Sequence, residues 1–165
     1  FLLDQANNDR SVGAIVVSGE GDSFCVGGDS QALQGHSARG SYDSGVSSDI
    51  ALPGYGIDER FDATFAYHFG LNKPIVAAIN GAAAGVGLAL AAFADIRFAV
   101  PKAKLTTAHG KLNLPAEYGL SWVLPRIVGL GRANDLLLTS RVFLSEEAEK
   151  NRFCKPTFFF GTAFT

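Results

Sequence analysis

The sequence of 165 residues contains no methionine and only two cysteines. Cys25 and Cys154 are too few for a disulfide framework, and neither lies in a metal-ligand spacing. This cysteine usage favours a reducing compartment, so we expect a cytoplasmic protein without a bound metal. The sequence begins at Phe1 and resembles part of a longer chain, so mitochondrial and peroxisomal locations remain open alternatives.

Long hydrophobic runs and a surplus of charge of either sign are also absent. The most apolar stretch, 75–94, contains three glycines and is followed by Asp95. We therefore expect a buried strand and helix there and not a membrane span. The 14 Lys and Arg residues nearly balance the 16 Asp and Glu residues, for a net charge of −2. This balance predicts no nucleic-acid partner and no attraction to an anionic membrane.

Three sequence motifs of common enzyme classes are missing or incomplete. No GxxxxGK[ST] is present, which excludes a P-loop, and no GxSxG is present, which argues against a serine-hydrolase elbow. The segment "GVGLAL" (85–90) lacks the third glycine of a dinucleotide fingerprint. A phosphate-cradling nucleotide enzyme is therefore not indicated.

What the sequence does contain is an alternation of strands and helices in a chain that is 47% hydrophobic and 18% charged. We predict strands over 12–19, 74–80, 95–100 and 103–107, and helices over 1–8, 62–72, 82–94, 120–129, 131–140 and 145–151, the last with Ser145 as N-cap. Residues 19–29 have turn chemistry, and 35–60 have the composition of a surface loop. This order predicts an α/β domain.

Two buried strands in this order lead into a glycine-rich bend. "GAIVVSG" is followed by "FCVGGD", and "PIVAAING" is followed by "AGVGLA". Backbone N–H groups at such bends have no partner inside a helix, so two neighbouring bends can hold an oxygen that carries negative charge. Close packing of a buried helix explains the same glycines equally well from the residues alone.

Three segments carry a more specific signal: "SFCVGGD" (23–29), "KPIVAAINGAAAGVGLALAAFADIRFA" (73–99) and "GLSWVLPRIVGLGRANDLLLTSRVFLSEEA" (119–148). In order and spacing they resemble the enoyl-CoA hydratase/isomerase family, the crotonase superfamily. The resemblance implies a spiral of strand-turn-helix units, incomplete at both ends, with a core over 1–148 and an unassigned tail over 149–165. The family's leading unit and its C-terminal helices have no counterpart in the sequence.

The resemblance implies an enzyme of fatty acid metabolism that acts on an acyl-CoA thioester. Coenzyme A would be part of the substrate, no separate cofactor would be needed, and the assembly would be a homotrimer or a dimer of trimers. Matched to the family motifs, the backbone N–H groups of Gly28 and Val86 form the oxyanion hole. The substrate-binding positions would be Val26, Asp29, Gly85 and Gly87.

The sequence departs from the hydratases of this family at two catalytic positions. Their glutamates fall here on Ala89 and His109, whereas Glu117 stands where some isomerases of the superfamily place a carboxylate. One base is enough for isomerisation, because it can remove a proton from C2 and return it to C4. Glu117 and His109 are therefore the predicted catalytic residues. A plain helix N-terminal acid and a surface histidine are the alternatives at these positions.

Three readings of the function follow from these departures. The leading one is an isomerase-like enzyme in which a single carboxylate moves the proton. A hydratase with a rearranged acid/base pair is the second, and a catalytically silent acyl-CoA-binding protein of the same fold is the third. Among other residues, we expect Asp95 and Arg97 to have structural roles and Trp122 to lie in the core.

Overall fold

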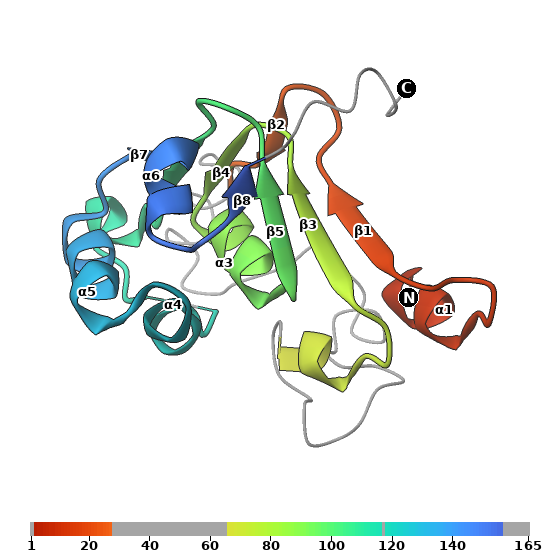
Figure 1. The fold of residues 1–165 in the computed structure, drawn as a ribbon. Helices are drawn as coiled ribbons and strands as arrows, with labels where there is room; N and C mark the ends of the chain where they lie inside the picture. The colour runs from red at the N-terminus through yellow and green to blue at the C-terminus, as the bar shows by residue number, and fades with distance from the viewer. Residues whose placement is uncertain (1, 28–65, 117, 157–165) are drawn as a thin grey trace, which may run out of the picture.

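The structure is a computed structural model that describes residues 2–27, 66–116 and 118–156 (Figure 1). The α-helices are α1 (Leu2–Asn8), α3 (Val86–Phe93), α4 (Leu120–Val128), α5 (Leu130–Thr139) and α6 (Ser145–Lys150). Two 3-10 helices are η2 (Ala66–Gly70) and η3 (His109–Leu112). The strands are β1 (Ile15–Ser18), β2 (Ser23–Cys25), β3 (Ile75–Ile79), β4 (Ala82–Ala84), β5 (Ile96–Ala99), β6 (Lys104–Thr106), β7 (Phe143–Leu144) and β8 (Lys155–Pro156).

The strands form two sheets of four strands each. The first sheet has the order β1-β3-β5-β8 and the second has the order β2-β4-β6-β7. Every pair is parallel except the antiparallel pair of β6 and β7. Along the chain, a strand of the first sheet is followed directly by a strand of the second: β1 by β2, β3 by β4 and β5 by β6. This repeated unit confirms the predicted α/β fold.

The core lies around β3 and α3. The burial of β3 alternates, with Ile75, Ala77 and Ile79 each 1% exposed, because the strand is central in the first sheet. Helix α3 is apolar on all sides and contacts β2, β4 and α4, which buries Leu88 completely. Full burial of one such leucine contributes about 1.5–3 kcal/mol. The prediction that the helix is enclosed on all sides is thus confirmed.

The predicted helix over 82–94 is wrong in its first residues, since Ala82–Ala84 form β4. Their backbone pairs with β2 on one side and with β6 on the other, which the helix propensity of alanine does not reveal. Gly85, at φ 54° and ψ −118°, then breaks the strand and α3 begins at Val86. Residues 23–25, predicted as part of a turn, are strand β2 for the same reason: a neighbouring strand pairs with them.

The region from β7 onward also differs from the prediction. Ser145 is not the N-cap of α6, because its backbone N–H donates to the Ala103 carbonyl at 3.0 Å and its hydroxyl accepts from the Ala103 N–H at 3.2 Å. Leu144, with extended backbone, is the N-cap instead. The boundary at residue 148 stays a prediction, although 149–156 continue into the fold with buried Phe153 and strand β8.

Two charged residues and one tryptophan, whose roles were predicted from the sequence, are described by the structure. Asp95 accepts from the Ile75 N–H at 2.7 Å, and Arg97 donates to the Phe153 carbonyl at 2.6 Å, in agreement with the predicted structural roles. Trp122 was predicted to be core but is 49% exposed, because α4 buries its opposite side. The guanidinium carbon of Arg126, one helical turn later, lies 3.9 Å from the centroid of the Trp122 ring and covers it.

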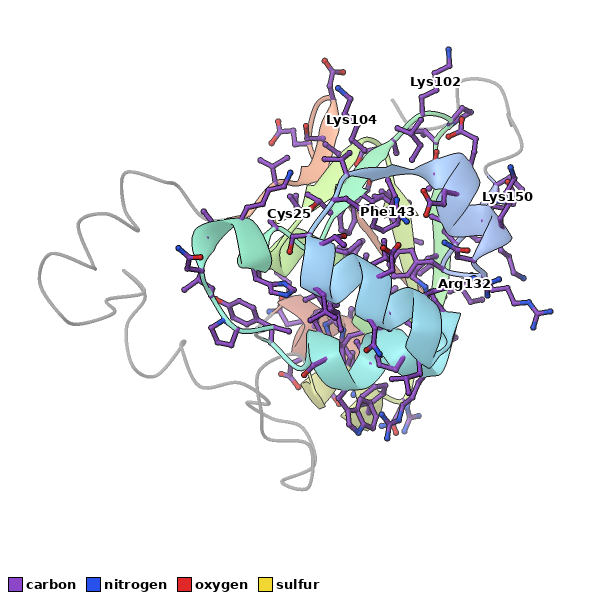
Figure 2. The ribbon with its side chains drawn as sticks, turned by 90° about the vertical axis from the view of Figure 1, so that its left-hand side faces the viewer. Cys25, Lys102, Lys104, Arg132, Phe143 and Lys150 are labelled. Carbon is purple, nitrogen blue, oxygen red and sulfur yellow. The ribbon has the colours of Figure 1, made fainter. Side chains whose placement is uncertain are left out.

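Figure 2 shows buried and exposed side chains in one view. Phe143, labelled in Figure 2, is 3% exposed and pairs with Leu105 across β6 and β7. Lys102, Lys104 and Lys150 extend outward in the same view and are exposed. Among the helices of the three described segments, none combines the length and the apolar character that crossing a bilayer requires.

Candidate active site

The carboxyl ends of β2, β4 and β6 meet at one edge of the second sheet. These strands are parallel neighbours, with Cys25 paired to Ala83 and Ala84 paired to Thr106. The residues that follow the strands therefore share that edge. A Cβ built on Gly27 would lie 3.5 Å from the Ala84 carbonyl oxygen. In parallel sheets, ligands bind beyond the carboxyl ends of the strands.

Gly87, in the first turn of α3, presses this helix onto the end of β2. A Cβ on Gly87 would lie 2.0 Å from the carbonyl oxygen of Cys25 and 2.7 Å from its carbonyl carbon. Cys25 is labelled in Figure 2. Only glycine permits this approach, because the carbonyl oxygen and carbon of Cys25 belong to the backbone and cannot turn away. The described part of the first bend, up to Gly27, is therefore held beside the second bend.

Val86 is the first residue of α3, so its N–H has no acceptor inside the helix. Gly85 before it is held by a hydrogen bond from its N–H to the Thr106 carbonyl at 3.1 Å. The Gly85 carbonyl in turn accepts from the Ala89 N–H at 3.1 Å, which starts the helix. The positive end of the helix dipole adds to the attraction of this N–H for negative charge.

His109 follows β6 on a tight turn at the same edge. Ala108 has φ 60° and ψ −32°, and the His109 N–H donates to the Thr107 carbonyl at 2.7 Å. This is a three-residue γ-turn of the rare form with positive φ. The His109 Nδ1 lies 3.2 Å from the same carbonyl oxygen, and a Cβ on Gly85 would lie 3.9 Å from the Ala108 methyl carbon. The turn that carries His109 therefore borders the bend that carries Val86.

Comparison with known proteins identifies the family of this chain. The family model described as Enoyl-CoA hydratase/isomerase matches residues 2–152. The chain belongs to the enoyl-CoA hydratase/isomerase family. This confirms the resemblance of the three sequence segments, and the solved structures of the family confirm the crotonase fold.

Individual relatives support this membership. The chain is 36% identical over 151 residues to a Mycobacterium tuberculosis protein named "Probable enoyl-CoA hydratase EchA12", covering 90% of this chain and 50% of that protein. It is 31% identical over 148 residues to the 1,2-epoxyphenylacetyl-CoA isomerase of Escherichia coli, covering 90% and 53%. The crystal structure of an enoyl-CoA hydratase from Mycobacterium marinum superposes with a TM-score of 0.63 at 33% identity, covering 94% and 62%. The chain spans about half the length of the curated relatives that it matches.

Of the substrate-binding positions expected from the family, three are described by the structure. Val26 is 61% exposed beyond the end of β2, and Gly85 and Gly87 flank Val86. Ala89, where a hydratase of the family would carry a glutamate, is 1% exposed and presents only a methyl group. This enoyl-CoA hydratase/isomerase family member therefore has no carboxylate at that position.

Three predicted site residues, Gly28, Asp29 and Glu117, lie outside the described residues, and their assigned roles stay predictions. Residues with positive φ nevertheless adjoin all four predicted catalytic and oxyanion positions: Gly27 at 97°, Gly85 at 54°, Ala108 at 60° and Tyr118 at 55°. Ala108 and Tyr118 carry side chains, so each conformation costs about 1–3 kcal/mol and persists only where surrounding contacts impose it. Neither alanine nor tyrosine is a turn signal, so the residue types alone do not predict these two conformations.

Within residues 2–27, 66–116 and 118–156, no three His, Cys, Asp or Glu side chains are grouped so that they could share a metal ion. At this edge the backbone N–H of Val86, which has no acceptor inside α3, is available as a donor. Such an edge can bind and polarise a carbonyl oxygen.

Proposed function

We propose that this chain forms the catalytic core of an acyl-CoA enzyme with isomerase-like chemistry. The thioester oxygen of the substrate binds between the N–H groups of Gly28 and Val86. Glu117 removes a proton from C2 of a 3-enoyl thioester, and the electron pair of that bond becomes an enolate. The double bond then moves from C3–C4 to C2–C3, and the same carboxyl group returns the proton to C4.

The observation that carries this proposal is the contact between Gly87 and Cys25. It joins the two bends so tightly that a single Cβ would meet a backbone oxygen at 2.0 Å. A pair of preorganised backbone donors stabilises an enolate-like oxygen without any reorganisation during the reaction. Loss of one such donor costs about 10²–10³ in kcat.

The methyl group of Ala89 favours proton transfer by one carboxylate. Hydration in this family uses two glutamates, whereas proton transfer between C2 and C4 needs one base. The Escherichia coli relative named 1,2-epoxyphenylacetyl-CoA isomerase supports isomerase chemistry in a related chain.

A hydratase is the second candidate, and the placement of His109 favours it. The turn after β6 brings His109 to the edge where the family's second glutamate would act, and relatives named as enoyl-CoA hydratases support the chemistry. In that case Glu117 and His109 would share the transfer of protons to and from water. The assembly, a trimer or a dimer of trimers, stays a prediction in either case.

The test is to measure turnover of a 2-enoyl-CoA and a 3-enoyl-CoA by the wild-type protein and by Glu117→Gln. We expect isomerisation to fall by about 10²–10⁴-fold, because glutamine preserves the shape but cannot accept the proton. Glu20→Gln, in the exposed turn between β1 and β2, is the matched control and should retain full activity. Activity that survives Glu117→Gln would refute the assigned base. Hydration lost in both Glu117→Gln and His109→Gln would favour the hydratase. Binding of acyl-CoA by calorimetry without turnover would establish the silent alternative.

A further inference from the structure

A buried serine at the end of α5 anchors the turn that carries His109. Ser140 is 0% exposed and has φ 46°, as the C-cap of the helix. Its hydroxyl oxygen accepts from the Gly110 N–H at 2.9 Å, and its carbonyl accepts from the Thr106 hydroxyl at 3.0 Å. Helix α5 and η3 are in contact, so these bonds join the helix end to both sides of the turn.

The hydroxyl bonds form a directed chain. The Thr107 hydroxyl donates its only proton to the Leu136 carbonyl at 3.0 Å. The proton between the Thr107 and Ser140 hydroxyl oxygens, which are 3.1 Å apart, therefore comes from Ser140. The resulting order is Gly110 N–H, Ser140 O–H, Thr107 O–H and Leu136 carbonyl. Ser140 is the central link, because it both accepts and donates.

This chain opposes the strain of the turn. The positive φ of Ala108 costs about 1–3 kcal/mol, which the turn would release if it were free to relax. Thr107 before Ala108 and Gly110 after His109 are both bound to Ser140, so the two ends of the turn are fixed. The approach is close, since a Cβ on Gly110 would lie 2.7 Å from the Ser140 hydroxyl oxygen.

We propose that Ser140 is a positioning residue for His109. Its buried hydroxyl maintains the strained turn that places His109 beside the Val86 bend. A structural serine that merely ends α5 would need only its backbone conformation. The extra hydroxyl bonds to the strand-end turn indicate a role directed at His109. The catalytic consequence rests on the proposed function, but the geometric role does not.

Ser140→Gly tests this role, because glycine keeps the positive φ and removes the hydroxymethyl side chain with its hydroxyl group. Thr139→Ala is the matched control. It removes an exposed hydroxyl from the same helix end, where Thr139 donates to the Asp135 carbonyl at 2.7 Å. Gly110→Ala is a second variant that crowds the Ser140 hydroxyl from the opposite side and leaves the α5 cap unchanged.

The first readout is independent of activity. We expect amide hydrogen exchange at His109 and Gly110 to accelerate at least tenfold in Ser140→Gly and Gly110→Ala, with altered NMR shifts of the His109 ring. Thr139→Ala should leave both unchanged. Exchange rates and ring shifts in Ser140→Gly that equal those of Thr139→Ala would overturn the positioning role, whether or not the protein turns over an enoyl thioester.

The second readout is a double-mutant cycle on the turnover of enoyl-CoA. We expect Ser140→Gly to lower kcat about tenfold with little change in KM, and to have no further effect when His109→Ala is already present. Fully additive effects of the two changes would contradict a role that acts through His109. A wild-type protein without turnover would refute the proposed function alone, and hydrogen exchange would still decide the role of Ser140.

Discussion

The substitution Gly87→Ala addresses the contact that joins the two bends. The added methyl carbon would lie 2.0 Å from the Cys25 carbonyl oxygen and 2.7 Å from both the carbonyl carbon and the Cβ of Cys25. Ordinary van der Waals contact begins at 3.4 Å, so α3 and the end of β2 must separate by about 1.4 Å. No change of rotamer can relieve the contact with the carbonyl group, because it belongs to the backbone.

The separation has an energetic and a catalytic consequence. Overpacking of a filled core costs about 1–3 kcal/mol, and a backbone contact belongs at the upper end of that range. Misplacement of a catalytic group by about 1 Å costs roughly 10²-fold in rate. We therefore expect Gly87→Ala to lose about 3 kcal/mol of unfolding free energy and to lower kcat at least about 100-fold.

Urea denaturation measures the first effect, and steady-state kinetics on enoyl-CoA measures the second. Gly131→Ala in α5 is the control, because a Cβ there meets no heavy atom within 4 Å. Alanine should stabilise that helix by about 0.5–1 kcal/mol and leave kcat unchanged. The reasoning is refuted if Gly87→Ala retains kcat within about threefold of wild type and unfolds within about 0.5 kcal/mol of it.

Two further predictions follow from buried titratable groups. Burial lowers the pKa of His68, although the Phe93 backbone and Asp95 oppose the shift, so the unfolded chain binds more protons. The contribution of His68 to the unfolding free energy should be complete above pH 6.5, the pKa of the unfolded histidine. Below that pH the unfolding free energy should fall by up to about 1.4 kcal/mol per pH unit. Urea titrations at several pH values should show a weaker pH dependence in His68→Phe. An unchanged pH dependence in that variant would contradict this attribution. Burial also raises the pKa of the Cys154 thiol to about 11, so iodoacetamide at about pH 8 should label it only after unfolding, as mass spectrometry would detect. Equal labelling of the folded and unfolded chains would contradict it.

The sequence predicted those parts of the fold that have a local signal. The apolar run of β3 and the all-round apolar character of α3 follow from residue type, and both are confirmed. Strand β4 was missed because three alanines carry no strand signal, and pairing with β2 and β6 determines their conformation. Such pairing joins residues that are far apart in the sequence, so a local pattern does not contain it.

Part of the candidate site could likewise be predicted from the sequence, and part of it could not. Glycine-rich bends predicted backbone donors, and the family resemblance assigned these donors to Gly28 and Val86, an assignment that stays a prediction. The strained turn at Ala108 has no sequence signature, since alanine rarely adopts positive φ. The hydroxyl of Ser140, 32 positions later, holds it through contacts that appear only in the folded chain. Trp122 was predicted to lie in the core, but it is exposed on the surface because α4 buries its opposite side.

We propose that two neighbouring backbone bends polarise the thioester oxygen of the substrate. The most direct measurement is the isotope-edited infrared spectrum of a bound acyl-CoA with a ¹³C-labelled thioester carbonyl. Hydrogen bonds to the oxygen weaken the C=O bond, so we expect a stretching frequency below that of the free thioester, with a smaller displacement in Gly87→Ala. A bound thioester whose carbonyl absorbs at the frequency of the free compound would contradict the account.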